Sequence, residues 1–330
     1  MSSSPPPDSV AADAAIAIDG SSDAVVAIDA ALDATLAIDA ALDAPIATPS
    51  CLDQWLAGNP SLSGPAELTM LSTSGSERDP WVTPDGLTLY FSRDSTAGGN
   101  GDIFQATRAS KSDPFSNANK VNNLSTNDDD DRPALNLDDE TMIALASDRD
   151  HRGTGGVDIY IATRTNATQG FGSPNRDHLG KVNAASSKNF DPFLNGDGLH
   201  LYFAPVVGAQ QQRIGVAART AVDQDFATPS AVGGIRTATT TGDDADPALS
   251  QDERVIVFSS TRSGGSGGTD LWFATRSGAT GDFSNLKRVP NVNGDKNDGD
   301  PMLSADGCDL YFASTRNGND YDLFVAHITL

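Results

Sequence analysis

The chain is poor in several residue types that common functions require. Its 330 residues include only 6 Lys, 4 Glu, 4 His and 2 Cys, whereas Asp occurs 41 times and the formal net charge is −23. Proteins bind nucleic-acid phosphates through clustered Lys and Arg, so this composition argues against a nucleic-acid binder. No run of 18 consecutive apolar residues is present, which excludes a transmembrane helix.

The few histidines and the many glycines do not form a recognisable site motif. His151, His178, His200 and His327 lie in different parts of the chain without metal-ligand spacing such as His-Glu-x-x-His. The glycine-rich stretches lack the Gly-Lys-Ser/Thr ending of a phosphate-binding loop and do not open helices. The sequence therefore does not support nucleotide binding.

The first 50 residues differ in composition from the rest. They contain eight Asp and no Lys or Arg, and Ala-Ile-Asp recurs every ten residues. A ten-residue period keeps no single helix face apolar, and a low-complexity segment of one charge sign seldom orders alone. We predict a disordered Ala/Asp-rich spacer at 1–50 and a folded domain at 51–330. The spacer resembles the tethers of bacterial surface lipoproteins, although the sequence carries no signal peptide.

Internal repetition is the strongest signal in the sequence. Five pairs, spaced by 53, 59, 55 and 54 residues, each open a module: Asp79-Pro80, Arg132-Pro133, Asp191-Pro192, Asp246-Pro247 and Asp300-Pro301. Each module continues with short aromatic and branched runs bounded by Gly, Asn and Asp, which is typical of strands. Four strands in each of five repeats predict an all-β five-bladed β-propeller of four-stranded antiparallel blades.

The repeat also predicts how the ring closes. The expected blades cover about 79–124, 132–184, 191–236, 246–292 and 300–330, and the fifth repeat ends after its third strand. Leu62, Leu68 and Leu71 match the spacing of the fourth element of blade 4. We therefore predict that an N-terminal strand at 66–74 completes blade 5, which removes two open sheet edges.

The modules resemble the TolB-type propeller repeat, a WD-like family. The family's blades begin with Asp-Pro, pass through a Ser-Pro-Asp-Gly-like hairpin and end on an Asp-Ile-Tyr strand; Thr83-Pro84-Asp85-Gly86 and Ser304-Ala305-Asp306-Gly307 match that hairpin best. The resemblance covers roughly residues 66–330. It implies a non-enzymatic, exported or surface-associated scaffold that binds a protein or another ligand, and we expect a monomer with an unidentified protein partner.

Acidic residues near the expected channel are the candidate binding residues. Four Asp-Pro pairs place a carboxylate there: Asp79, Asp191, Asp246 and Asp300. Such a ring suits a metal or a cationic group, unless each carboxylate only caps amides of its own turn. Asp295, Asp298 and Asp300 have spacing that suits calcium, although no complete calcium loop is present. The alternative function is therefore a metal-binding propeller with a structural or hydrolytic cation site, and no other cofactor is expected.

Glycosidases provide a further comparison, because some are five-bladed propellers with paired carboxyl groups across the channel mouth. The general acid in such sites is most often Glu. The chain has four Glu residues: Glu67, Glu77, Glu140 and Glu253. Only Glu77 falls in a loop near the expected channel mouth, so we do not expect glycosidase activity.

Ion pairs between Arg and Asp side chains are also predicted. Arg and Asp bracket the turn between the second and third strands in three repeats: Arg149 with Asp158, Arg262 with Asp270 and Arg316 with Asp322. Antiparallel pairing brings such residues together, and the third repeat has Val207 and Arg213 instead. We predict ion pairs, each contributing about 0–1 kcal/mol where exposed.

The two cysteines are predicted to meet at one blade. Cys51 lies 15 residues before the closing strand, and Cys308 lies in the first hairpin of blade 5. The start of the fourth strand and this hairpin are at the same end of an antiparallel blade, and 15 residues can cross a blade. We predict a disulfide, which would place the protein in an oxidising compartment; the alternative is two unrelated thiols.

Overall fold

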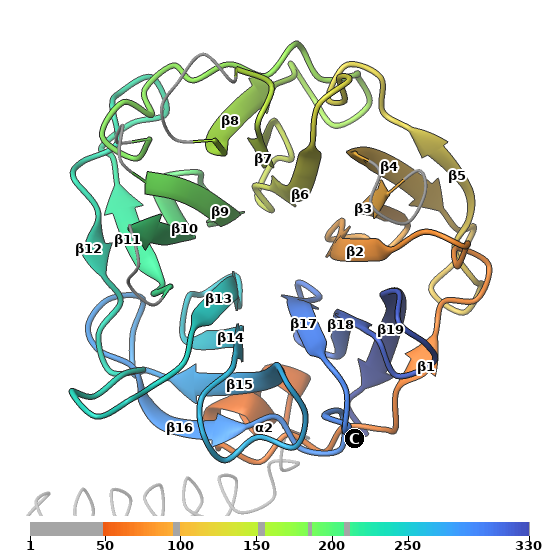
Figure 1. Ribbon diagram of the computed structural model, residues 1–330, viewed down its shortest axis with the longest axis vertical. Coiled ribbons are helices and arrows are strands. Elements are labelled where there is room, and N and C mark those ends of the chain that lie inside the picture. Colours follow the sequence, from red (N-terminus) through yellow and green to blue (C-terminus); the bar gives the residue numbers. More distant parts are fainter. Residues whose placement is uncertain (1–48, 95–99, 151–155, 184–186, 208–211, 330) are drawn as a thin grey trace, which may run out of the picture. The chain divides into compact units, whose positions relative to one another are not determined.

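The computed structural model describes residues 49–94, 100–150, 156–183, 187–207 and 212–329. Five antiparallel sheets stand around a central axis, four of them with four described strands and one with three (Figure 1). The predicted all-β five-bladed propeller is therefore confirmed. The interpretation of 1–50 as a disordered spacer falls almost entirely on residues outside the described ranges.

In every blade the first strand lies nearest the axis and the later strands follow outward (Figure 1). Blade 1 contains β2 (Glu77–Val82), β3 (Thr88–Asp94), β4 (Gly101–Thr107) and β5 (Ser116–Lys120). Blade 2 contains β6 (Asp130–Leu135), β7 (Met142–Ser147) and β8 (Asp158–Thr163), and blade 3 contains β9 (Ser187–Leu194), β10 (His200–Val207), β11 (Gly215–Ala218) and β12 (Ser230–Ala231). Blade 4 contains β13 (Asp244–Leu249), β14 (Val255–Ser260), β15 (Asp270–Thr275) and β16 (Ser284–Arg288), and blade 5 contains β17 (Asp298–Leu303), β18 (Asp309–Ser314) and β19 (Asp322–His327).

An N-terminal strand completes blade 5, as the spacing predicts. This strand, β1 (Ala66–Glu67), pairs antiparallel with β19. The amide of Ser63 donates to the carbonyl of His327 and the amide of Leu68 donates to the carbonyl of Leu323, each at 2.8 Å. The strand is shorter than the predicted 66–74, because the chain turns at Leu68, whose carbonyl accepts the amide of Leu71. The closure leaves neither end of the ring as an open edge.

Packing between blades forms the core. The middle strands carry consecutive apolar residues, and both members of such pairs are buried, as Tyr311 and Phe312 are in β18. Strands buried on both faces require a neighbouring sheet on each side, which the ring provides. Burying a side chain such as Phe312 stabilises the fold by about 1.5–3 kcal/mol.

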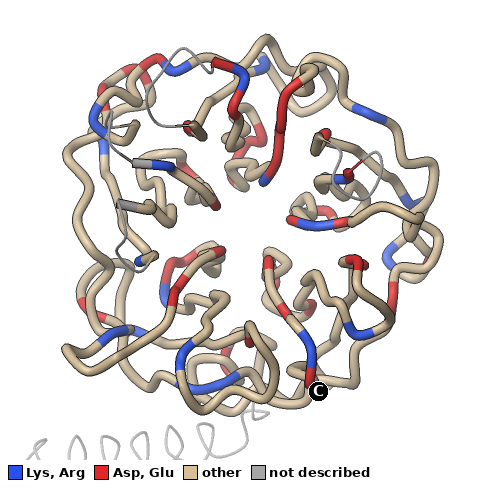
Figure 2. Tube along the Cα trace, in the orientation of Figure 1, with Lys and Arg blue, Asp and Glu red and all other residues tan. Residues whose placement is uncertain are grey.

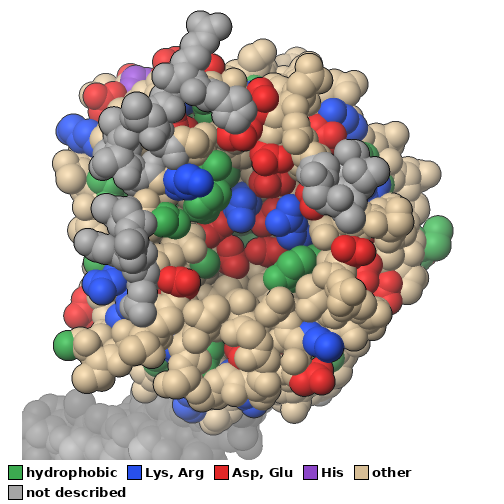
Figure 3. All heavy atoms as spheres, viewed as in Figure 1, with side chains coloured by type: hydrophobic (Ala, Val, Ile, Leu, Met, Phe, Trp, Pro, Cys, Tyr) green, Lys and Arg blue, Asp and Glu red, His purple; other side chains and the backbone are tan. Residues whose placement is uncertain are grey.

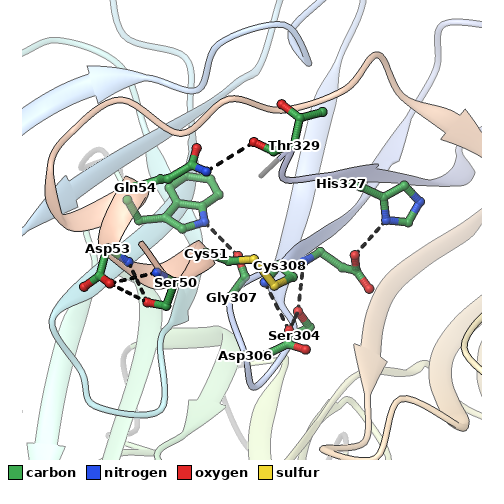
Figure 4. Close-up of a disulfide and its surroundings, with 12 residues drawn as sticks. Ser50, Cys51, Asp53, Gln54, Ser304, Asp306, Gly307, Cys308, His327 and Thr329 are labelled. Carbon is green, nitrogen blue, oxygen red and sulfur yellow. Dashed lines mark hydrogen bonds and ion pairs between the residues drawn. A yellow bond between two sulfur atoms is a disulfide. The ribbon is translucent and has the colours of Figure 1, made fainter. Parts of the chain in front are cut away.

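A short helix and a disulfide fasten the start of the folded domain to blade 5 (Figure 4). Helix α2 (Cys51–Leu56) begins with a capping box between Ser50 and Asp53. Trp55 is fully buried, and its Nε1 donates to the carbonyl of Gly307 at 3.0 Å. Cys51 and Cys308 are bonded with their Cα atoms 4.9 Å apart, so the structure contains the disulfide that the sequence predicts. A disulfide is typical of exported proteins.

In the part of the chain that the structure describes, no helix has the length and apolar character needed to span a bilayer.

Candidate functional site

The five residues that precede proline in the first strands share an unusual backbone conformation. Their φ angles are positive: 53° at Asp79, 60° at Arg132, 58° at Asp191, 49° at Asp246 and 52° at Asp300. The left-handed region costs an L-residue about 1–2 kcal/mol, and Asp tolerates it better than most residues. At each of these five positions, a β-bulge interrupts the pairing of the first strand with the second. The bulges bring all five side chains to the channel around the axis.

These side chains line a cavity on the axis, which we call the cup. Its wide part, of 340 Å³, is bounded by Arg132, Asp191, Asp246 and Asp300, with Phe190 and Tyr321 in its wall. A narrow part of 40 Å³ continues between the five prolines. Acidic and basic positions surround the axis in Figure 2, and Figure 3 shows their side chains gathered in a hollow at the centre of this face.

Apolar side chains close the channel beneath the prolines. The residues that follow proline in the five blades all belong to the buried core: Trp81, Ala134, Phe193, Ala248 and Met302. Trp81 of blade 1 and Phe193 of blade 3 have ring centroids 5.1 Å apart. These blades are not neighbours in the ring, so the two side chains meet across the axis, past the small Ala134 of blade 2. The cup is therefore closed at its inner end.

Charges in the cup are distributed unevenly. The Arg132 guanidinium contacts the carboxylate of Asp191, whose Oδ2 also accepts a hydrogen bond from Gln212 Nε2 at 3.2 Å. Arg132 stands where the other four blades have Asp. Among the described residues, no ion pair joins Asp79, Asp246 or Asp300 directly to a cation, although the Arg78 and Arg132 guanidinium groups lie near enough to act on their charge. One side of the ring thus holds a direct ion pair, and the other holds three carboxyl groups that two arginines influence without a direct pair.

Burial and crowding favour the protonated form of two of these carboxyl groups. Burial, together with the neighbouring carboxyl groups of Asp79 and Asp246, raises the pKa of Asp300 well above its usual value. Burial and Asp246 also raise the pKa of Asp191, whereas the Arg132 guanidinium opposes that shift. Asp300 and Asp191 belong to blades 5 and 3, which are not neighbours in the ring.

The structure brings the four predicted binding residues, Asp79, Asp191, Asp246 and Asp300, together in the cup. Two of these carboxylates accept a backbone amide from the next blade, and not from their own turn as the alternative assumed. Asp191 Oδ2 accepts the amide of Asp246 at 3.3 Å, and Asp246 Oδ2 accepts the amide of Asp300 at 3.4 Å. Each of these two carboxylates therefore contacts the next blade, and both contacts are long.

The three residues with calcium-like spacing do not form a site. Asp295 is exposed, Asp298 is fully buried and bound to Arg316, and Asp300 lies in the cup. Within the described ranges, no group of three or more His, Cys, Asp or Glu side chains could hold a metal ion. The spacing of these three residues in the sequence could not show that Arg316 binds Asp298.

The prediction of the three Arg–Asp pairs was wrong, because each arginine binds a different acid from the one predicted. Arg149, Arg262 and Arg316 reach back to buried acids at the start of the first strand, which are Asp130, Asp244 and Asp298 respectively. Their predicted partners are Asp158, Asp270 and Asp322; Asp158 binds Arg176 at 2.7 Å, and Asp270 lies 4.0 Å from Arg288. Asp130, Asp244 and Asp298 are fully buried, so each would be a buried charge without a partner if its arginine bound elsewhere.

The glutamates lie outside the cup. Glu77 is fully buried and accepts hydrogen bonds from Arg93 Nε at 2.9 Å and from Thr73 Oγ1 at 2.6 Å. Glu253 is buried in a separate cluster, where Tyr202 donates to it at 2.7 Å and His200 lies at 3.0 Å. Arg132 and Trp81 also line the cup, and the only sign of this in the sequence is that each lies next to a repeated proline.

Comparisons with known proteins show the fold. No family model matches the chain, and no curated protein matches its sequence. A GH43_1 enzyme from Xanthomonas citri is similar over 80% of this chain and 90% of its own, with 15% identity and a TM-score of 0.55. The catalytic domain of a GH62 alpha-L-arabinofuranosidase from Coprinopsis cinerea is similar over 82% of this chain and 96% of its own, with 10% identity and a TM-score of 0.52. TolB from Acinetobacter baumannii is similar over 66% of this chain and 47% of its own, with 18% identity and a TM-score of 0.39.

These similarities correct the functional expectation. The sequence-based hypothesis was a non-enzymatic scaffold, with a cation site as the alternative, but catalytic domains of glycoside hydrolases have the same fold. None of the matches reported above assigns the WD-like repeat family. The chain shares its propeller fold with the Xanthomonas and Coprinopsis enzymes.

Proposed function

We propose that the cup is the active site of a glycoside hydrolase, in which Asp300 is the general acid and Asp191 the general base. The observation that carries the proposal is the placement of these two carboxyl groups on non-adjacent blades around one cavity. Glycoside hydrolysis requires two carboxyl groups that flank the scissile bond. The fold of the Xanthomonas and Coprinopsis enzymes supports the same reaction class.

The environments of the two aspartates suit these different roles. Burial and the carboxyl groups of Asp79 and Asp246 raise the pKa of Asp300 against the opposing charges of Arg132 and Arg78, so Asp300 can keep a proton that passes to the leaving-group oxygen. The Arg132 guanidinium and Gln212 hold the orientation of Asp191, and the guanidinium opposes the rise in the pKa of Asp191 that burial and Asp246 cause. Asp191 would take a proton from water while that water attacks the anomeric carbon and the bond to the protonated leaving group breaks. The proton gained by Asp191 later returns to solvent, and Asp300 is reprotonated.

The cup also has features that suit a sugar ring. Phe190 and Tyr321 offer aromatic surface in its wall, and the carboxylates offer acceptors for hydroxyl groups. A volume of 340 Å³ lies at the lower end of the range for small-ligand sites, roughly 300–1,000 Å³. We further propose that the protein acts outside the cytoplasm, in the periplasm or at the cell surface, because its Cys51–Cys308 disulfide suits an oxidising compartment.

Hydrolysis of a panel of nitrophenyl glycosides tests this function. Asp300→Asn and Asp191→Asn should each lower kcat by about 10²–10⁴-fold on the substrate that the wild-type chain cleaves. The wild-type rate should fall at high pH, as Asp300 loses its proton, and at low pH, as Asp191 gains one. Asp223→Asn is the matched control, because Asp223 is exposed and lies outside the cup.

Two results would reject the function. The first is a folded wild-type chain that cleaves no glycoside in the panel faster than buffer does. The second is a cleaving chain whose rate is unchanged by both cup substitutions.

A further inference from the structure

A second cavity lies between blades 3 and 4, and we call it the side groove. Its volume is 410 Å³, and its walls come from β10, β11 and the chain around β12 in blade 3 and from the β15–β16 hairpin in blade 4. The described residues that line it include none of those that line the cup. Thr228, Ser230 and Thr280 contribute hydroxyl groups to its walls, and its volume suits a small ligand.

A glutamate in an unfavourable backbone conformation stands behind one wall of the side groove. Glu253 has a φ of 56° in the first hairpin of blade 4. Glycine adopts this left-handed conformation freely, whereas the Cβ atom of glutamate makes it costly. Blades 1, 3 and 5 have Gly86, Gly198 and Gly307 at the matching turn position, and blade 2 has Glu140. Blade 4 thus keeps a glutamate at a backbone cost, which points to a role for its side chain.

Four groups from blades 3 and 4 hold the Glu253 carboxylate. They are the Tyr202 hydroxyl at 2.7 Å, the Asn195 amide nitrogen at 2.8 Å, His200 Nδ1 at 3.0 Å and Arg276 Nη2 at 3.2 Å. Burial opposes the ionisation of Glu253, but the hydrogen bonds from His200, Tyr202 and Asn195 outweigh it and lower the pKa of this carboxyl group. An ionised carboxylate only accepts, so His200 Nδ1 carries a hydrogen that it donates to Glu253.

The second ring nitrogen of His200 is the one that a ligand can reach. The His200 side chain is 31% exposed and lines the side groove. Because Nδ1 is turned toward the buried Glu253, the exposed surface lies on the opposite edge of the ring, which carries Nε2. Among the described residues no group bonds to Nε2, and Nε2 is not one of the buried nitrogens that lack a partner. His200 therefore presents an accessible Nε2 at the wall of the side groove.

The charges around His200 leave one positive charge at this wall. Arg276 and Glu253 form an ion pair at 3.2 Å, so they balance each other. The hydrogen bond to Glu253 raises the pKa of His200 against the effect of burial; Asp197 also raises it, and Arg276 lowers it. His200 thus stays protonated to a higher pH than an ordinary histidine. Asp282, on the blade 4 wall, is exposed to water and salt, which screen its charge.

We infer that the side groove binds a small carboxylic acid, whose carboxylate accepts a hydrogen bond from His200 Nε2. A hydrogen bond from an imidazolium to a carboxylate is charge-assisted, which makes it stronger than one between neutral groups. The hydroxyl groups of Thr228, Ser230 and Thr280 can pair with hydroxyl groups of the ligand. Hydroxylated acids, which include acidic sugars, are therefore the expected ligand class. This site goes beyond the proposed function, because it is separate from the cup.

Histidine NMR on the wild-type chain tests the inference at His200 itself. Methyl glucuronoside and methyl glucoside differ only in a carboxylate that replaces the hydroxymethyl group. At about pH 6, methyl glucuronoside should shift the His200 ring signals saturably, whereas methyl glucoside should not. The affinity measured from these shifts should fall about 10-fold or more by about pH 9, as His200 loses its proton. Lactate, a smaller hydroxy acid, supports a broad ligand class if it gives the same shifts and a class of acidic sugars if it does not.

Two matched variants separate the free nitrogen of His200 from the one that holds Glu253. His200→Asn places an amide nitrogen where Nδ1 lies, so it keeps the bond to Glu253 and removes the Nε2 donor. Calorimetry should show that the binding event seen by NMR is weakened about 10-fold or more. His327→Asn is the control and should bind as the wild-type chain does: His327 Nδ1 also bonds to an acid, Asp309, at 2.7 Å, but His327 does not line the side groove. Thermal melting verifies that both variants are folded.

Several results would overturn the inference. They are His200 ring signals that neither acid moves, signals that methyl glucoside moves equally, an affinity that is the same at both pH values, and unchanged binding by the His200→Asn variant. Glycoside hydrolysis in the cup is measured separately, so the proposed function and this inference can each fail while the other stands.

Discussion

At the scale of single residues, a buried acid and an arginine recur in four of the five blades. In blade 2, Asp130 is fully buried, and its Oδ1 accepts hydrogen bonds from Ser147 at 2.6 Å and from the Arg149 guanidinium. The Arg149 guanidinium also lies 5.0 Å from the centre of the Tyr160 ring. In blade 3 the acid is replaced by Asn189. The arginine and the acid are lost together there because either charge alone would be buried without a partner.

Substitution in blade 2 tests this coupling. Arg149→Met should lower the free energy of unfolding by about 3 kcal/mol, because Asp130 remains buried without its cation. Adding Asp130→Asn, which copies the blade 3 residue, should restore much of that loss. Urea unfolding of the single and double variants measures both effects, and the coupling is absent if the two changes prove additive.

Asp300 provides a second prediction at the residue scale. Its raised pKa means that folding favours the protonated form, so its contribution to stability is full below the unfolded-state pKa of about 3.9. That contribution is lost as the pH rises through the folded-state pKa. Asp300→Asn should therefore melt higher than the wild-type chain at pH 7.5, by about 2–4 °C for each kcal/mol recovered. Calorimetry near pH 4 should show a much smaller difference, and a constant difference at all pH values would argue against a buried, protonated Asp300.

At the scale of elements, the blades and their closure could be predicted because similar residues recur at regular intervals along the sequence. The five pre-proline positions mark the first strands, and the match of Leu62, Leu68 and Leu71 to blade 4 located the closing strand near β1. Side-chain partners were less predictable. Arg93 and Asp102 are opposite one another in the β3–β4 register, yet Arg93 binds Glu77 instead. Sequence spacing gives the register of strands, but it does not show which acid is the most deeply buried.

Removing the closing strand should destabilise the propeller. Deleting residues 62–74 exposes the edge of β19, and an unpaired edge strand promotes association with other chains. We expect soluble aggregates or a poorly folded chain in size-exclusion chromatography and circular dichroism. A chain that begins at Pro49 and keeps β1 is the control, and a monomeric, cooperatively melting deletion variant would show that β1 is dispensable.

At the scale of the whole molecule, two features join parts that are distant in the sequence. The Cys51–Cys308 disulfide spans 257 residues, and the Trp81–Phe193 contact joins blades 1 and 3 across the axis. The disulfide could be predicted, since topology brings both cysteines to one end of one blade. The contact across the axis could not, because it depends on how closely five blades approach one another and on the small Ala134 between them. The closed floor of the cup was therefore beyond sequence-based prediction.

Reduction of the disulfide should destabilise the entire propeller. A cross-link over a loop of this length constrains the unfolded chain by about 5 kcal/mol on the loop-entropy model. Cys51→Ser combined with Cys308→Ser should lower the denaturant midpoint without changing the circular dichroism of the folded state. The matched control is the wild-type chain with and without reductant, and an unchanged midpoint would mean that helix α2 and β1 hold the closure without covalent help.

The left-handed backbone at the five pre-proline positions has a consequence for how this molecule can evolve. Asn adopts that conformation about as readily as Asp, so exchanging the two alters the charge of the ring while leaving the bulges and prolines in place. Arg132 shows that even a long cation is accommodated there, at a φ of 60°. Each blade thus contributes one position where mutation can change the charge around the axis while the backbone is kept. Asp79, Asp246 and Asp300 could change one at a time, whereas a lineage of such propellers would have to change Arg132 and Asp191 together, because they form an ion pair.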